Sequence, residues 1–266
     1  EVFDAAGQQQ RAAAWQEAFV RTRVDYFTDD GNWCGPAGDK PYRGLELGSY
    51  LVPFLRSGNP TAIARANAIF ANSEKYWKGC FETADSYQPM PETIALLTCR
   101  SLLTDAARHR MEKICATCCE RFVKLDRWEF QGDNDNFQLL ANACLAGWGV
   151  YTKNPELVRI ARGRYEQYRE ILTRRGFGSE FNSPSYIVIH LFALAAAAEL
   201  VDDPAFRKLA MELETRVWMD LLTHYHPPTG VQAGPSSRCY NFDIYGSQLS
   251  RFHLYLLFGD RLLGKW

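Results

Sequence analysis

Long apolar runs are missing from this sequence of 266 residues. The longest candidate, residues 187–200, is interrupted by His190 and Glu199 and is shorter than the ~20 residues that span a membrane. An excess of either charge is missing too, because 30 Lys and Arg residues and 31 Asp and Glu residues give a net charge of −1. Such a balance offers no electrostatic attraction to nucleic acid or to an anionic membrane. We therefore predict a soluble protein that binds neither.

Strand signals are scarce as well. The sequence has no long alternation of apolar and polar residues, and no Asn-Gly or Asp-Gly turn between β-branched runs. Apolar residues recur instead at the helical spacing i, i+3, i+4 and i+7. The segments with this spacing, which predict about ten helices, are 13–27, 45–55, 62–77, 93–103, 111–123, 139–150, 158–172, 186–200, 206–222 and 244–257. We therefore predict an all-α fold in a single domain, residues 1–266.

Cysteines are too few for a dense disulfide scaffold, with eight in the chain. Cys115, Cys118 and Cys119 look like half of a metal site, but no second half follows at a zinc-finger spacing. Because the triplet also lies inside a helical pattern, we expect small buried side chains here. We expect no metal and no other cofactor.

Short turns repeat along the chain. Residues 58–60, 153–155 and 202–204 each combine Asn or Asp with Pro between two predicted helices, where the first caps a helix and Pro fits its first turn. They are separated by one or two steps of roughly 48 residues, and Thr104 supplies a capping signal near the missing middle position. Periods of this length are typical of stacked helical pairs.

The opposite ends of the helical pairs are long loops rich in glycine, aromatic, acidic and amide residues. They cover 78–90, 125–136, 175–186 and 224–243. Polar helices alternate with apolar ones, as outer and inner helices do. This pattern predicts an α/α toroid of about five hairpins, closed or incomplete, with an open superhelical solenoid as the alternative. In either case, function is expected on the long-loop face.

Three motifs follow one another in these loops. They are Glu-Phe-Asn-Ser-Pro-Ser-Tyr at 180–186, His-Tyr-His-Pro-Pro-Thr-Gly at 224–230 and Ala-Gly-Pro-Ser-Ser-Arg-Cys-Tyr at 233–240. With them, residues 130–245 resemble poorly characterised proteins of the α/α-toroid glycan-processing class, which is similar to toroid polysaccharide lyases and glycoside hydrolases. The resemblance implies a carbohydrate-active enzyme with an oligosaccharide or polysaccharide substrate.

A lyase is the reaction that we favour. β-Elimination from a uronate needs groups that neutralise the carboxylate, a base for the C5 proton and an acid for the leaving oxygen. Toroid lyases use Asn or Arg, His and Tyr for these tasks. The resemblance therefore implies that Asn136 and Arg238 neutralise the carboxylate, that Tyr186 or Tyr240 transfers the proton and that His226 assists. Arg238 is the cation that a basic tyrosine needs nearby, and Arg238→Ala is expected to abolish turnover with little change in stability.

Other residues of the loops complete the candidate site. Asn134, Asn182 and His190 are expected to bind substrate, and Trp33 and Trp128 to stack on sugar faces. A glycoside hydrolase is the runner-up, with Asp135 and Glu180 as its paired carboxylates. Two further alternatives remain: a non-enzymatic helical module that binds a peptide or protein in its groove, and a toroid that acts on isoprenoids.

Several candidates also have a purely structural interpretation. Asn134 can be a helix N-cap, and Asn182 can cap a helix whose first turn holds Pro184. His190 lies in an apolar helix, where a buried histidine satisfied by a neighbour is common. His226 precedes two prolines and can belong to a rigid loop. These interpretations differ from the functional ones in what each side chain contacts.

The sequence leaves the location and the oligomeric state open. It begins at Glu1 without an initiator methionine or a basic-then-apolar leader, so a targeting segment was removed or the chain was trimmed. An extracytoplasmic location is favoured over the cytoplasm. Five hairpins are one short of a six-hairpin ring, and a missing segment or a second subunit in a homo-oligomer could supply a sixth.

Overall fold

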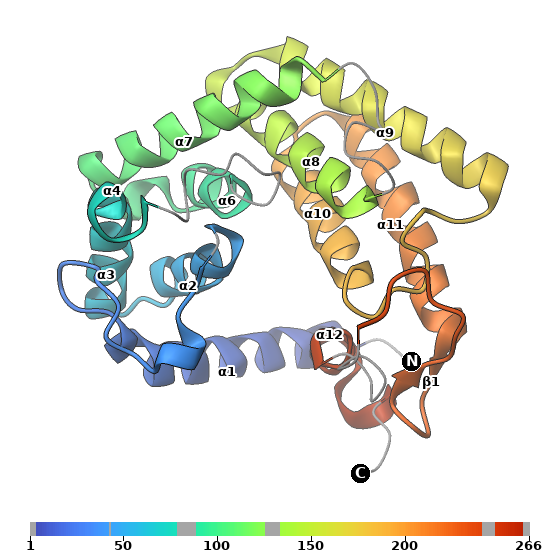
Figure 1. The fold of residues 1–266 in the computed structure, drawn as a ribbon, viewed down its shortest axis with the longest axis horizontal. Helices are drawn as coiled ribbons and strands as arrows, with labels where there is room; N and C mark the ends of the chain where they lie inside the picture. Colours follow the sequence, from blue (N-terminus) through green and yellow to red (C-terminus); the bar gives the residue numbers. More distant parts are fainter. Residues whose placement is uncertain (1–3, 43, 79–88, 126–133, 241–247, 263–266) are drawn as a thin grey trace. The chain divides into compact units, whose positions relative to one another are not determined.

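The computed structural model describes residues 4–42, 44–78, 89–125, 134–240 and 248–262. Within these ranges the chain is mostly helical, which confirms the all-α prediction (Figure 1). The α-helices are α1 (Ala5–Arg23), α2 (Gly44–Arg56), α3 (Pro60–Ala71), α4 (Ser73–Tyr76), α6 (Met90–Thr98), α7 (Asp105–Val123), α8 (Asp135–Thr152), α9 (Pro155–Arg175), α10 (Ile187–Leu200), α11 (Pro204–His224) and α12 (Gln248–Phe258). No helix among the described residues is long and apolar enough to cross a membrane.

Four short 3₁₀ helices and one small hairpin complete the described elements. The 3₁₀ helices are η1 (Val24–Tyr26), η2 (Ala37–Asp39), η3 (Arg100–Leu102) and η5 (Gly259–Leu262). The hairpin pairs β1 (Tyr225–His226) with β2 (Val231–Gln232) in antiparallel register, Tyr225 opposite Gln232 and His226 opposite Val231. The sequence predicted a loop at this place, because two-residue strands are too short to show an alternating pattern.

The predicted short turns are confirmed by their caps. The Asn59 side chain accepts hydrogen bonds from the backbone N–H groups of Thr61 and Ala62, and Pro60 occupies the first turn of α3. At the start of α11, Asp203 accepts from the N–H of Phe206 at 2.9 Å. The Thr104 hydroxyl caps α7 in the same way. Each cap satisfies backbone donors that the first helical turn leaves without a partner.

The chain divides into two compact units. The first unit contains Glu1–Ala14, Arg127–Leu140 and Arg162–Trp266, and the second contains Trp15–Asp126 and Ala141–Ala161. Nothing in this division tests the expected single domain, which stays a prediction.

The second unit has an apolar core between its helices. α2 packs against α3 and α6, and α7 packs against both α3 and α6. Leu47, Phe54 and Phe70 are completely buried there. Cys115, Cys118 and Cys119 lie buried on α7, as expected, and burial raises the pKa of the Cys115 and Cys119 thiols. These thiols therefore stay protonated and behave as small apolar side chains.

The first unit is organised around α10, which packs against α11 and α12 (Figure 1). The residues Ile187, Leu191 and Leu194 of α10 are buried, as are Phe206 and Leu213 of α11. α10 is apolar nearly all round because it has neighbours on several sides. Its first turn follows directly on the loop that carries the candidate site.

Candidate functional site

Glu180 is the centre of a buried hydrogen-bond network in the first unit. It lies in the loop between α9 and α10, and its side chain has no exposed surface. Its Oε2 accepts from the backbone N–H of Asn136 at 2.9 Å and from Nε2 of His190 at 3.0 Å. Its Oε1 accepts from Nη1 of Arg238 at 2.6 Å, and Nδ2 of Asn136 lies 2.7 Å from both oxygens. These donors compensate for the loss of water around a buried carboxylate.

The network keeps Glu180 ionised. Burial by itself raises the pKa of Glu180, but the hydrogen bond and charge of His190 and the hydrogen bonds of Asn136 outweigh it and lower the pKa below its usual value. Because a carboxylate only accepts hydrogen bonds, Nε2 of His190 carries the proton of their shared bond. The structural interpretation of His190, a buried histidine satisfied by a neighbour, is therefore confirmed. Its side chain is 4% exposed.

Arg238 connects this buried network to the surface. Nη1 donates to Glu180 and, at 2.5 Å, to Oδ1 of Asn134. Nη2 donates to the hydroxyls of Tyr186 at 3.0 Å and Tyr240 at 2.9 Å, and these two hydroxyls are 2.6 Å apart. The guanidinium also lies over the Tyr186 ring, 4.2 Å from its centre. We call Arg238, Asn134, Tyr186 and Tyr240 the Arg238–tyrosine cluster.

The cluster is open to solvent at one end. Tyr240 is 39% exposed and the Arg238 side chain is 34% exposed, whereas Glu180 beneath them is fully buried. A guanidinium with two hydroxyls at an accessible position can bind an anionic group and exchange protons with it. The site therefore places a positive charge and two hydroxyl groups near the surface, above a buried carboxylate.

Asn182 holds the loops of the site together. Its backbone is left-handed, with φ of 46°, and its Nδ2 donates to the carbonyl oxygens of Ala233 at 2.6 Å and Pro235 at 2.9 Å. The Ser183 hydroxyl donates to the Arg238 carbonyl at 2.8 Å. The interpretation of Asn182 as the cap of α10 is therefore wrong, since α10 begins only at Ile187. The prediction that Asn182 binds substrate is not supported by these contacts, because its amide is already used.

Asp135 also fixes the loop between α9 and α10. Its carboxylate accepts from the backbone N–H of Ser179 at 2.6 Å and of Glu180 at 3.4 Å, and the residue is 2% exposed. A Cβ atom at Gly178 would come within 2.5 Å of Oδ2 of Asp135 and within 2.7 Å of the Tyr168 hydroxyl, so this close approach requires glycine. Asp135 and Glu180, the predicted carboxylate pair of a hydrolase, thus both order the loop.

The pKa of Tyr186 differs from the sequence-based expectation. Arg238 does lie beside both tyrosine hydroxyls, as predicted, and its charge lowers the pKa of Tyr186. Burial and the hydrogen bond with Tyr240 have the larger effect and raise the pKa of Tyr186 to about 12. Tyr186 is therefore protonated at neutral pH and is suited to donate a proton rather than to take one.

Three other predicted residues are not members of this cluster. His226 is exposed on β1, where its Nδ1 lies 2.8 Å from the Thr229 hydroxyl across the turn of the hairpin. Trp33 belongs to the second unit and packs edge-on against Phe27 and Tyr26. Trp128 lies outside the described residues. The histidine that reaches Glu180 is His190, which the sequence assigned to substrate binding.

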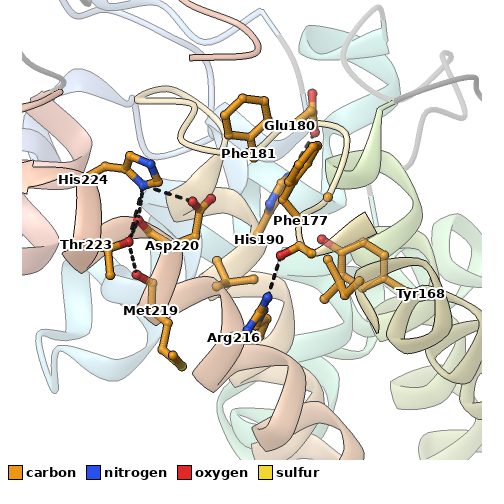
Figure 2. Close-up of a pocket in the computed structure, with 14 residues that line it drawn as sticks. Tyr168, Phe177, Glu180, Phe181, His190, Arg216, Met219, Asp220, Thr223 and His224 are labelled. Carbon is orange, nitrogen blue, oxygen red and sulfur yellow. Dashed lines mark hydrogen bonds and ion pairs between the residues drawn. The ribbon is translucent and has the colours of Figure 1, made fainter. Parts of the chain in front are cut away.

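A pocket of about 340 Å³ lies in the first unit beside the same buried pair, Glu180 and His190 (Figure 2). Among the wall residues that sequence reasoning missed are Phe177, Arg216 and Asp220. Asp220 and His224 lie four residues apart on α11, and His224 opens the second of the three motifs. That spacing on one helical face is the signal that links Asp220 to the site.

Comparison with known proteins yields one finding. A family model described as a domain of unknown function (DUF8769) matches residues 95–260, more than half of the chain and all of the site. No curated protein and no solved structure matches the sequence significantly. The function is therefore inferred from the contacts of Glu180 and Arg238 described above.

Proposed function

The chain belongs to the DUF8769 family, and we propose that it is a polysaccharide lyase that cleaves a uronic-acid-containing glycan by β-elimination. One observation carries the proposal: Nη2 of Arg238 contacts two tyrosine hydroxyls at an accessible position while Nη1 is fixed on buried Glu180. We also propose that the helical pairs form an α/α toroid, closed or incomplete. The resemblance of residues 130–245 to glycan-processing toroids supports both ideas.

The substrate carboxylate binds Arg238 and Asn134 in this proposal. Both are partly exposed, and the 2.5 Å hydrogen bond from Nη1 of Arg238 to Oδ1 of Asn134 places the amide of Asn134 beside the positive charge of the guanidinium. Neutralising the carboxylate makes the proton on C5 acidic. Asn136 was expected to take this role, but it is completely buried and its amide is bonded to Glu180. Asn136 is instead a positioning residue for Glu180 and, through it, for Arg238.

The two tyrosines move the protons. Tyr240 takes the proton from C5 while its own hydroxyl proton passes to Tyr186 across their 2.6 Å hydrogen bond, and the electrons of the broken C–H bond form the double bond between C4 and C5. The C4–O4 bond breaks, and O4 takes a proton from the Tyr186 hydroxyl, which its raised pKa keeps protonated. Each tyrosine thus gives up one proton and gains one, so both hydroxyls are restored within the same step.

The environments of Glu180 and Asp135 favour elimination over hydrolysis. A glycoside hydrolase needs one carboxylic acid that stays protonated and a second carboxylate that faces the sugar. The pKa of Glu180 is lowered, and the oxygens of both Glu180 and Asp135 accept hydrogen bonds from the loop or its neighbours. Hydrolysis by this pair therefore requires the network to break first.

The experiment is incubation with a panel of uronate-containing polysaccharides. Elimination forms an unsaturated uronyl end that absorbs at about 235 nm, and a parallel reducing-end assay counts every cleavage. We expect absorbance and reducing ends to rise together. Reducing ends without absorbance would establish hydrolysis, and silence in both assays would favour a non-enzymatic module; either result overturns the proposal.

A further inference from the structure

The pocket beside the Glu180–His190 pair is a second place where a ligand fits. Its volume of about 340 Å³ is within the range of small-molecule sites. We call it the α9–α11 pocket. It is lined by parts of α9, α11 and the loop between α9 and α10, and the residues that matter here are Phe177, Phe181, Arg216, Asp220 and His224.

Two phenylalanines form an apolar wall. The rings of Phe177 and Phe181 are 4.7 Å apart between centres, and Phe177 is 49% exposed. Figure 2 shows both rings beside Glu180 and His190. Exposing a large aromatic side chain at a concave surface is unfavourable unless a ligand covers it. The flat C–H face of a pyranose ring packs well on such an aromatic surface.

Two polar groups lie across from this wall. Nδ1 of His224 lies 2.8 Å from the Asp220 carbonyl and 3.2 Å from its carboxylate, which orients the ring (Figure 2). Because Nδ1 donates to Asp220, Nε2 is the acceptor of the neutral ring. The Asp220 carboxylate is itself fixed by the backbone N–H of Asn182 at 2.7 Å. His224 is thus held by the same loop that carries Glu180.

Arg216 brings a positive charge to the pocket. Its Nη2 donates to the Gly176 carbonyl at 2.6 Å, which fixes the guanidinium at the edge. A guanidinium has five N–H donors, and this bond uses one of them. A fixed guanidinium matches the geometry of a carboxylate.

We propose that the α9–α11 pocket binds one uronate ring of the substrate chain. The ring stacks on Phe177 and Phe181, its carboxylate pairs with Arg216, and a hydroxyl donates to Nε2 of His224. This inference deepens the proposed function and rests on it for the choice of a glycan. The binding itself needs no elimination, so the two can be tested separately.

The test uses methyl glycosides of glucuronate and galacturonate, with the methyl glycoside of glucose as the neutral probe. Their O4 bears only hydrogen, so they have no sugar leaving group for elimination. Binding is followed by titration in protein NMR with the full chain. The variants are Phe177→Ala, with Phe192→Ala as the matched control, and Arg216→Gln, with Arg174→Gln as control. Phe192 is 36% exposed and the Arg174 side chain is 67% exposed, and neither is among the residues that line the pocket.

We expect the uronosides to bind more tightly than the glucoside. Phe177→Ala should weaken all binding about tenfold, Arg216→Gln should remove the preference for uronosides, and the controls should match the wild type. Equal affinity for the three probes, or unchanged affinity in both pocket variants, would overturn the inference. If these probes bind as expected but no polysaccharide is cleaved, the pocket stands and the lyase proposal fails.

Discussion

Arg238 has two kinds of partner, buried Glu180 and the accessible tyrosine hydroxyls, so removing it has two effects. Arg238→Ala abolishes turnover in our account, and it also leaves a buried carboxylate with one donor fewer. We therefore expect a loss of roughly 1–3 kcal/mol in the free energy of unfolding, larger than the sequence alone suggested. Urea unfolding measures it, with Arg174→Ala as the control. Unchanged stability would show that the Glu180 ion pair contributes nothing.

Substitutions at Tyr186 and Tyr240 should affect catalysis with little effect on stability. Replacing either by Phe removes a hydroxyl and keeps the ring in place. We expect kcat to fall by roughly 100-fold or more, because proton transfer is lost, with a change in unfolding free energy below about 1 kcal/mol. Tyr255→Phe, at a tyrosine that is 37% exposed on α12, is the control. Wild-type rates in both active-site variants would remove the tyrosines from the mechanism.

Glu92 makes stability depend on pH. It is completely buried in the second unit, and burial raises the pKa of its carboxyl from 4.5 to about 8. The folded protein therefore holds a proton that the unfolded chain releases, so this contribution is complete below pH 4.5 and is lost as the pH rises to about 8. We expect the Tm of the wild type to fall across this window and that of Glu92→Gln to fall less. Exposed Glu17→Gln is the control, and parallel curves for the two variants would contradict the assignment.

Residue chemistry was predictable only in part. Loop composition and the motifs predicted Arg238, Tyr186 and Tyr240 as candidates, and the structure brings these three side chains into contact. Composition could not tell that Glu180 is an anchor, since burial and four converging donors arise only when separate segments meet. Asn134 and Arg238, which share a hydrogen bond, are 104 positions apart in the chain.

At the scale of elements, the caps make a local contribution that can be measured. Asp203 caps α11 through the backbone N–H of Phe206, and Asp203→Ala should lower the free energy of unfolding by about 1 kcal/mol. Asp202→Ala is the matched control, because the Asp202 side chain is 95% exposed and takes no part in the cap. Equal effects of the two substitutions in thermal or urea unfolding would argue against the cap.

Helices were the most predictable elements because apolar periodicity reports directly on a buried face. Each predicted segment overlaps an observed helix, and the errors lie at their ends. The segment 62–77 is divided into α3 and α4 at Asn72, and 93–103 ends in the 3₁₀ helix η3. Predicted segment 244–257 begins in residues outside the described ranges. A break of this kind depends on the backbone conformation of a single residue. Apolar periodicity is read over several helical turns, so it does not detect such a break.

At the scale of the whole molecule, the helical spacing of apolar residues predicted the fold class, and the apolar character of α10 predicted its burial. The contacts between side chains of different loops could not be predicted from the sequence in the same way. A repeat shows that the loops of successive hairpins are equivalent, yet it does not state which side chains touch. The contacts around Glu180 are known only from the structure.

The most direct test of the central claim is the mass of the products formed in water labelled with a heavy oxygen isotope. Elimination adds no water, so the account predicts unsaturated products that lack the label and are lighter than hydrolysis products by one water molecule. The same products should disappear in Tyr186→Phe. Labelled, saturated products from any polysaccharide of the panel would show hydrolysis and contradict the account.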